Sequence, residues 1–115
     1  MIRCSFLIAL LNDLGSGPAY FFALVEHLIA SATALGLSQE QATRLATQTC
    51  LGAGKMLKQS SETPEQLRTN VTSPNGTTFA GLEVLEQMGF RDVVNAAVKA
   101  AALRAKELGQ SLDKQ

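Results

Sequence analysis

Residues 38–59, SQEQATRLATQTCLGAGKMLKQ, decide the fold class of this chain. Ser38 and, three residues later, Gln41 form the pattern of a capping box, in which each side chain bonds to a free backbone N–H group at the start of a helix. Apolar and small residues then recur at helical spacing, which predicts one long helix that ends near Gln59. Its narrow face of small residues would allow another helix to approach closely. That face consists of Ala42, Leu45, Ala46, Thr49, Gly52, Ala53, Met56 and Leu57.

The sequence predicts a helix on either side of this segment. The earlier one begins near Pro18, which suits the first helical position because its missing N–H needs no partner there. It ends at Gly36, since a glycine in left-handed conformation followed by an apolar residue is a common helix stop. After the long helix, Thr63 is a cap residue followed by Pro64, and the short helix that they begin ends near Val71.

The C-terminal part of the sequence predicts two more helices. One begins at Thr77 or Thr78 and ends at Gly89, and the other spans residues 91–108. Ala and Val cover so much of the circumference of the last helix that it should be buried on more than one side. A monomer of 115 residues supplies too little cover for that. Residues 109–115 are expected to be a frayed tail. Because no segment shows a strand pattern, we predict an all-α bundle of about five helices.

The charge balance argues against nucleic-acid and membrane partners. Ten basic side chains offset ten acidic ones, whereas nucleic-acid binding requires a net basic surface. The charges alternate along the chain, so there is no polybasic run for a membrane surface. No segment approaches the ~20 consecutive apolar residues that cross a bilayer. We therefore expect neither kind of partner.

The cysteines and the N-terminal segment bear on localisation. Cys4 and Cys50 fit neither a metal-ligand spacing nor a redox pair, which predicts two free thiols in a reducing compartment, the cytoplasm. Residues 1–14 contain Arg3 and a short apolar run, but a signal peptide needs a longer apolar region and a small-residue cleavage site. We interpret residues 1–14 as an irregular segment that precedes the domain.

Two other patterns, the glycine pairs and the single histidine, give little support to a functional site. Gly15-Ser16-Gly17 and Gly52-Ala53-Gly54 do not complete a dinucleotide-binding fingerprint, and neither follows a predicted strand. Close helix packing explains the second glycine pair better. His27, the only histidine, has no Ser or Cys nucleophile placed beside it by the sequence. We therefore predict no nucleotide site, hydrolytic triad or metal site made by this chain alone.

Residues 71–82, VTSPNGTTFAGL, are the strongest candidate for a binding site. Ser73-Pro74 favours an extended or turn geometry, and Asn75-Gly76 is a turn dipeptide that tolerates positive φ. Thr77 and Thr78 then open a helix whose first N–H groups lack internal partners, and such a helix start attracts anions. Their two hydroxyl groups could orient a small polar ligand. The alternative, from the residues alone, is an ordinary capped helix start after a conventional turn.

These residues also carry a family resemblance. In the order GSGPAYFF, LATQTCLGAGKML and TPEQLRTNVTSPNGTTFAGLEVLEQMGFR, residues 15–108 resemble the C-terminal dimerisation domain of pyrroline-5-carboxylate reductase. GSGPAY at the first helix and VTSPNGTT at the turn are the specific motifs. The resemblance implies a helical bundle that interlocks with a second copy as a homodimer, which would cover the apolar last helix. It also implies reduction of 1-pyrroline-5-carboxylate to proline with NADPH or NADH, the last step of proline biosynthesis.

The resemblance further implies roles for individual residues. Ser73, Gly76, Thr77 and Thr78 would hold the substrate, with its carboxylate on the backbone N–H groups of the last three. The ring nitrogen would face the hydroxyl of Thr78, which makes Thr78 the candidate catalytic residue. Asn70 would line the same pocket from the short helix.

The sequence departs from the family at three places. Asn75 stands where Gly is usual, and Asn is the next most tolerant residue of positive φ. Thr69 replaces a usual acidic residue, which removes a local charge partner. Residues 1–14 do not resemble the family, and the nucleotide-binding domain that precedes the family's dimerisation domain is not found in the sequence. Because hydride transfer needs a bound cofactor, we expect this chain to be the dimerisation and substrate-loop half of the reductase. Alone it is expected to bind neither NADP nor NAD and to be inactive.

Two other functions remain open from the sequence. One is a non-catalytic helical module that associates with itself and binds no ligand. The other is a proline-binding remnant that lacks the cofactor domain. The expected partners are a second copy of the chain, pyrroline-5-carboxylate or proline, and a separate nucleotide-binding domain, on which the choice between NADPH and NADH would depend.

Overall fold

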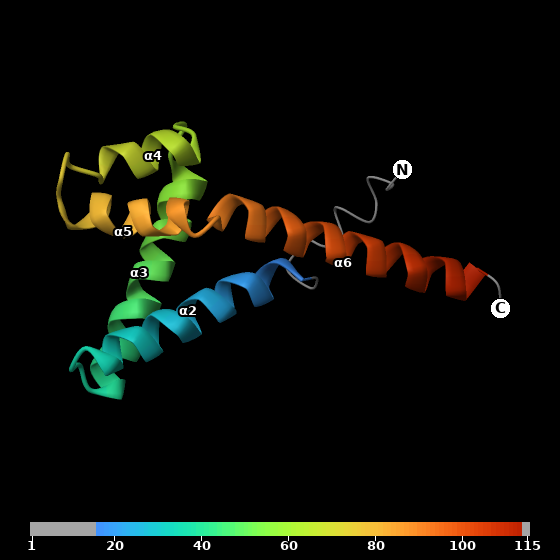
Figure 1. Ribbon diagram of the computed structural model, residues 1–115, viewed down its shortest axis with the longest axis horizontal. Helices are drawn as coiled ribbons and strands as arrows, with labels where there is room; N and C mark the ends of the chain where they lie inside the picture. Colours follow the sequence, from blue (N-terminus) through green and yellow to red (C-terminus); the bar gives the residue numbers. More distant parts are fainter. Residues whose placement is uncertain (1–15, 114–115) are drawn as a thin grey trace. The chain divides into compact units, whose positions relative to one another are not determined.

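A computed structural model describes residues 16–113 of the chain, so the predictions for residues 1–14, Cys4 among them, lie outside the described residues. Within residues 16–113 there are five helices and no strand, which confirms the predicted all-α fold class. Figure 1 shows them in chain order. They are α2 (Gly17–Ala34), α3 (Gln39–Gln59), α4 (Pro64–Asn70), α5 (Thr77–Gln87) and α6 (Phe90–Asp113).

The chain divides into two compact units. Among the described residues, the central unit is Phe22–Glu83, and the terminal unit combines residues 16–21 with residues 84–113. Both boundaries fall inside helices, one in α2 and one in α5. The turn singled out by the sequence, residues 71–78, lies entirely in the central unit. Its geometry can therefore be described within that unit alone.

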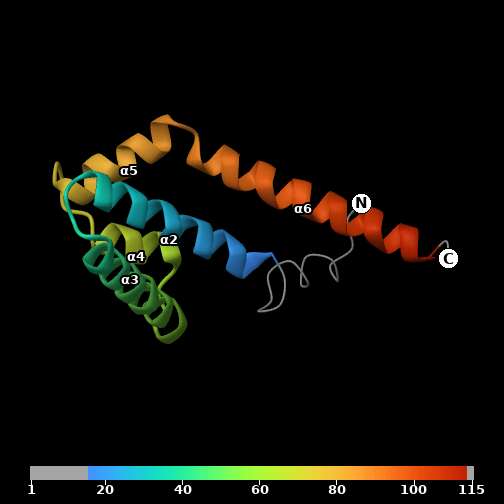
Figure 2. The same ribbon diagram turned by 90° about the horizontal axis from the view of Figure 1, so that it is seen from below.

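A tight connection links α2 to α3. The N–H of Leu37 donates to the carbonyl oxygen of Ala32 at 3.2 Å, and the N–H of Gly36 donates to that of Thr33 at 3.1 Å. This pair of bonds is the Schellman motif, and it requires the left-handed backbone that Gly36 adopts at φ 120°. The predicted helix stop at Gly36 is confirmed, and Figure 2 shows α2 and α3 leaving this connection.

The predicted capping box at the start of α3 is also confirmed. The Ser38 hydroxyl accepts the N–H of Gln41 at 3.1 Å, and the Gln41 side-chain oxygen accepts the N–H of Ser38 at 3.2 Å. The helix ends at Gln59, as predicted. At the start of α4, the Thr63 hydroxyl accepts the N–H of Gln66 at 3.1 Å, with Pro64 at the first helical position.

The last two helices agree with the sequence except at one boundary. Gly89, with φ 81°, separates α5 from α6 as predicted. The expected end of the last helix at Leu108 was wrong, because α6 continues through Gly109 to Asp113. A single glycine lowers helix stability by only about 1 kcal/mol relative to alanine. Since no proline follows Gly109, nothing in the sequence breaks the backbone hydrogen bonds there.

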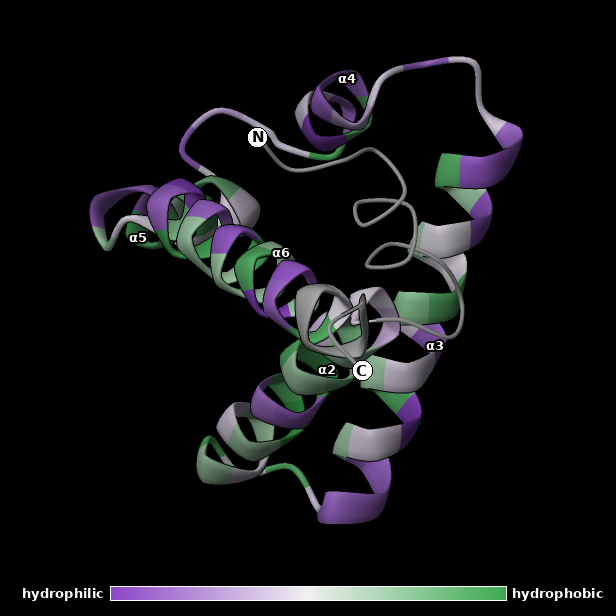
Figure 3. Cartoon of the chain, turned by 90° about the vertical axis from the view of Figure 1, so that its right-hand side faces the viewer, coloured by the Kyte–Doolittle hydropathy of each residue, from purple (hydrophilic) through white to green (hydrophobic). Residues whose placement is uncertain are grey.

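Few side chains of the described residues are buried. In the part of the chain whose burial is described, two apolar side chains are fully covered, Ala42 in the central unit and Ala102 in the terminal unit. Large apolar side chains are exposed in both units, with Leu35 90% exposed and Met88 79% exposed. In α2, Glu26 is the only charged residue, and Figure 3 shows the apolar character of this helix. The fold therefore leaves much apolar surface for contact with another molecule.

The small-residue face of α3 is also open. A Cβ atom placed on Gly52 or Gly54 would meet no atom within 4 Å beyond the local backbone of the helix. The expected close packing of another helix against these glycines is therefore not seen among the described residues. A helix contributed by a different molecule would find room there, since the two glycines lack side chains that would hold it away.

Candidate ligand-binding turn

The backbone turns tightly at residues 73–76, in the loop that connects α4 to α5 (Figure 1). The N–H of Gly76 donates to the carbonyl oxygen of Ser73 at 3.1 Å. Asn75 adopts φ 58° and is the only residue other than glycine with positive φ in residues 16–113. The predicted turn at Asn75-Gly76 is confirmed, with positive φ at Asn75 and not at Gly76.

Gly76 is needed at its position because of the Ser73 side chain. A Cβ atom on residue 76 would collide with the Ser73 hydroxyl oxygen and would lie 3.3 Å from the Ser73 carbonyl oxygen. Any larger residue would therefore push the Ser73 side chain away from the start of α5. In the same helix, a Cβ on Gly81 would meet nothing within 4 Å. Of these two positions, residue 76 is therefore the one at which an added side chain would require Ser73 to move.

The start of α5 presents free donors. The first helical hydrogen bond runs from the N–H of Ala80 to the carbonyl oxygen of Gly76 at 3.1 Å. Among the described residues, no group accepts the N–H of Thr77, Thr78 or Phe79. The positive end of the helix dipole adds to these donors, so the site favours an anion such as a carboxylate. The N–H of Gly76 is already directed to Ser73, which leaves Thr77 and Thr78 as the open donors among the three N–H groups that the family resemblance implied.

The hydroxyl groups of the turn are available as well. In the central unit, three threonine hydroxyls donate to the carbonyl oxygen four residues earlier, at 2.6–3.0 Å: those of Thr49, Thr69 and Thr72, the last at the start of the turn. By contrast, the hydroxyls of Ser73, Thr77 and Thr78 bond to no group among the described residues. Thr78 is exposed to solvent. These hydroxyls can therefore bond to a bound molecule without breaking an internal hydrogen bond.

Asn70 takes part in a separate hydrogen-bond network. Its side-chain nitrogen donates to the Glu62 carboxylate at 2.7 Å, and its side-chain oxygen accepts from Gln66 at 2.8 Å. It also lines a shallow hollow that includes Ser60 and Leu67. Asn70 makes no hydrogen bond to residues 73–78. The structure thus brings Ser73, Gly76, Thr77 and Thr78 together and connects Asn70 instead to Glu62 and Gln66.

Sequence reasoning did not identify Glu62 or Gln66. The spacing of Gln66 and Asn70, four residues apart on a helix, was a usable signal because such side chains lie side by side. Glu62 precedes the helix and lies eight residues from Asn70, so its contact depends on the path of the chain before α4.

The described residues, 16–113, form helices, turns and loops. They contain no strand, so the strand-turn-helix unit that cradles a dinucleotide pyrophosphate is not formed by residues 16–113. Gly52 and Gly54 lie inside α3 and not at its start. Cys50 is a half-buried free thiol, and His27 is exposed on α2. Within residues 16–113, no group of three His, Cys, Asp or Glu side chains could hold a metal ion.

None of the helices in residues 16–113 combines the length and the apolar character needed to cross a bilayer.

The sequence of the chain is similar to known reductases. The family model "Pyrroline-5-carboxylate reductase dimerisation" matches residues 7–108. Pyrroline-5-carboxylate reductase 1 of Bacillus subtilis (strain 168) is 45% identical over 100 residues, which cover 87% of this chain and 34% of the relative. The reductase of Arabidopsis thaliana is 48% identical over 97 residues, covering 84% of this chain and 35% of the relative. The chain thus spans about a third of the length of the curated relatives that it matches.

Solved structures show the same relationship. The crystal structure of Plasmodium falciparum pyrroline carboxylate reductase with NADP bound matches with a TM-score of 0.83 and 37% identity, over 92% of this chain and 42% of that one. The Coxiella burnetii pyrroline-5-carboxylate reductase matches with a TM-score of 0.81 and 44% identity, over 90% of this chain and 37% of that one. The fold and the sequence therefore agree with the resemblance carried by GSGPAY and VTSPNGTT. The chain belongs to the pyrroline-5-carboxylate reductase dimerisation family.

Proposed function

We propose that this chain is the self-associating part of a pyrroline-5-carboxylate reductase and carries the turn that holds its substrate. The observation that carries the proposal is the open start of α5, where the N–H groups and the hydroxyls of Thr77 and Thr78 are unpaired directly after the Ser73–Gly76 turn. Membership of the dimerisation family supports it. The ligand would be pyrroline-5-carboxylate or its product proline.

Self-association is supported by the uncovered apolar residues of both units. Phe22 in the central unit is 72% exposed, and Val93 in the terminal unit is 63% exposed. Surfaces of this kind match the interfaces of obligate homodimers, which are more apolar than the rest of a protein surface. A second copy of the chain is the proposed partner. Sedimentation equilibrium tests this: a mass near twice the 12.2 kDa of one chain supports it, and a mass that stays at 12.2 kDa at high concentration contradicts it.

The substrate would bind through its carboxylate and its ring nitrogen. The carboxylate accepts the free N–H groups of Thr77 and Thr78, where the helix dipole stabilises the negative charge. The hydroxyl of Thr78 faces the ring nitrogen and donates a hydrogen bond to it when the imine is reduced to the amine. Ser73 fixes the position of the turn, and Asn70 approaches the ligand from α4.

The hydride donor, NADPH or NADH, is proposed to be held outside residues 16–113. Since these residues do not form a nucleotide-binding fold, a separate nucleotide-binding domain or chain would supply the reduced nicotinamide. We place the protein in the cytoplasm, where the Cys50 thiol stays reduced.

The corresponding experiment is an assay of NADPH and NADH oxidation by the purified chain with pyrroline-5-carboxylate. We expect no turnover above a heat-killed control, because the nicotinamide has no binding fold to hold it against the imine carbon. Turnover by the chain alone would contradict the proposal that a separate nucleotide-binding domain or chain holds the hydride donor.

A further inference from the structure

We propose that Glu62 is a positioning residue whose carboxylate fixes the orientation of the Asn70 side-chain amide. The part of this inference that concerns the ligand rests on the proposed function, in which Asn70 approaches the substrate. The part that concerns the amide orientation rests on the hydrogen bonds of the central unit alone.

Three side chains form a chain of hydrogen bonds along α4. The Asn70 side-chain nitrogen donates to Glu62 Oε2 at 2.7 Å, and Gln66 Nε2 donates to Asn70 Oδ1 at 2.8 Å. Both ends of the Asn70 amide are therefore engaged at once. The network spans from the residue before the cap of α4 to the last residue of that helix.

Only Glu62 gives this network a direction. An amide can exchange its oxygen and nitrogen by a half turn about its last bond, and Asn70 and Gln66 could both turn in this way and still bond to each other. An ionised carboxylate only accepts hydrogen bonds, so it requires a donor from Asn70. The Asn70 nitrogen must then face Glu62, and its oxygen must face Gln66. Hydrogen bonds to a charged acceptor are also stronger than those between neutral groups, which further favours the orientation with the Asn70 nitrogen toward Glu62.

The residues next to the network are held in place. The N–H of Glu62 donates to the Ser60 hydroxyl at 3.0 Å, and the N–H of Gln66 donates to the Thr63 hydroxyl at 3.1 Å. These bonds fix the backbone of Glu62 and Gln66 between the end of α3 and the start of α4. The network therefore ties this connection to Asn70, the residue directly before the loop that carries the ligand-binding turn.

The oriented amide keeps spare capacity for a ligand. Asn70 has two N–H donors and an oxygen that can accept twice, and the network uses one of each. The second N–H donor and the second acceptor site of Asn70 then remain free for a ligand, and the fixed orientation of the amide determines where each of them lies. Glu62 and Asn70 both line a hollow of about 490 Å³ on the central unit, together with Met56, Gln59, Ser60 and Leu67.

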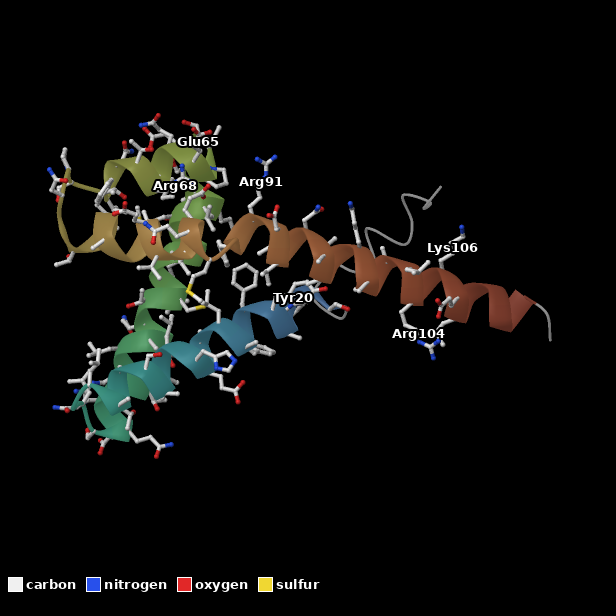
Figure 4. All side chains as sticks on the ribbon, in the orientation of Figure 1. Tyr20, Glu65, Arg68, Arg91, Arg104 and Lys106 are labelled. Carbon is white, nitrogen blue, oxygen red and sulfur yellow. The ribbon has the colours of Figure 1, made fainter. Side chains whose placement is uncertain are left out.

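The side-chain NH2 resonances of Asn70 report the orientation directly. We would record them by ¹⁵N NMR in the full-length chain and in the variants Glu62→Gln and Glu62→Ala. Removing the carboxylate should move both resonances toward the values of a free side-chain amide, more in Glu62→Ala than in Glu62→Gln, where the new amide can accept a bond from Asn70 but can itself turn. The matched control is Glu65→Gln, because Glu65 is an exposed carboxylate on the same helix that makes no side-chain bond to Asn70 (Figure 4). Equal spectra for the Glu62→Gln and Glu65→Gln chains would overturn the proposal.

Titration with proline provides a second, independent readout. Loss of the fixed orientation should raise the dissociation constant of proline by about fivefold in Glu62→Gln, the effect of one hydrogen bond, and leave it unchanged in Glu65→Gln. If the Asn70 resonances move and the proline affinity does not, Glu62 orients the amide but not for this ligand, which overturns the positioning role. If the unaltered chain binds no proline, the proposed function fails, and the NH2 resonances still decide whether Glu62 fixes Asn70.

Discussion

Ser73 and Gly76 lie so close to each other that a side chain on residue 76 would require the Ser73 hydroxyl to move away. The N–H of Gly76 donates to the Ser73 carbonyl oxygen at 3.1 Å, and a Cβ on residue 76 would collide with the Ser73 hydroxyl oxygen. This contact closes the turn in front of α5 and leaves the N–H groups of Thr77 and Thr78 open. The proposed carboxylate site therefore depends on a glycine that contributes no side chain of its own.

Gly76→Ala should damage the turn and the site together. The added methyl group must rotate the exposed Ser73 hydroxyl away and crowd the Ser73 carbonyl oxygen, so we expect the free energy of unfolding to fall by up to about 1 kcal/mol and proline binding to weaken. Chemical denaturation measures the first effect, and a proline titration measures the second.

The matched control for this prediction is Gly81→Ala, in the interior of α5. A Cβ there meets nothing within 4 Å, and alanine is the better helix former, so the free energy of unfolding should rise by up to about 1 kcal/mol. If Gly76→Ala behaves like Gly81→Ala, the contact between residues 73 and 76 does not shape the turn.

Asn75 should tolerate glycine and resist alanine. Its φ of 58° is accessible to Asn and Gly but costs most other residues roughly 1–2 kcal/mol. We expect Asn75→Ala to lower the free energy of unfolding by about 1 kcal/mol and Asn75→Gly to change it by less than about 0.5 kcal/mol. Thermal denaturation of the two variants under the same conditions provides the comparison. A stability loss in Asn75→Gly as large as that in Asn75→Ala would mean that the Asn side chain, and not its backbone, matters here.

The capping box of α3 should contribute measurably to stability. Ser38→Ala removes the acceptor of the Gln41 N–H, and the loss of such a cap costs about 1 kcal/mol. Ser61→Ala is the control, because the exposed Ser61 side chain makes no hydrogen bond among the described residues. Circular dichroism during urea unfolding should show a lower midpoint for the first variant and an unchanged midpoint for the second.

A charge on the exposed apolar surface of α6 should weaken self-association. Val93 is 63% exposed in one chain, and burying a valine in an interface contributes about 1.5–3 kcal/mol, so Val93→Glu should weaken a dimer by at least about tenfold. Asn95→Glu adds the same charge two residues away at an exposed polar position. Sedimentation velocity over a range of concentrations distinguishes the two. Equal dissociation of both variants would indicate a general charge effect and not the loss of an apolar contact.

The helix boundaries were predictable where they depend on local chemistry. The stop at Gly36, the capping box of Ser38 and Gln41 and the break at Gly89 each involve residues within one helical turn, so their spacing is visible in the sequence. The last helix was predicted to end at Leu108, before a frayed tail, whereas α6 continues to Asp113 because a single glycine does not break a helix. Packing was harder to predict: the small-residue face at Gly52 and Gly54 is open in this chain. A sequence pattern indicates that a face can be packed, but not which molecule supplies the partner.

The candidate site was predictable only where it depends on residues that are neighbours in the sequence. The turn at Asn75-Gly76 and the free helix start at Thr77 follow from backbone preferences of neighbouring residues. The contact of Glu62 with Asn70 does not, since it joins side chains eight residues apart across the start of α4. Its existence depends on how Ser60 and Thr63 hold the connection between α3 and α4.

The most direct test of the central claim is the effect of proline on the melting temperature of the chain and of its Thr78→Val variant. A ligand that binds only the folded state raises the free energy of unfolding, by about 2.7 kcal/mol at a hundred times its dissociation constant. We predict that proline raises the melting temperature of the unaltered chain and that pyrrolidine, which lacks the carboxylate, does not. The Thr78→Val substitution should abolish the effect of proline on the melting temperature and leave the mass of the protein in solution unchanged. A chain that melts at the same temperature with and without proline, or a Thr78→Val variant that keeps the full shift, would contradict the assignment of the turn as the substrate site.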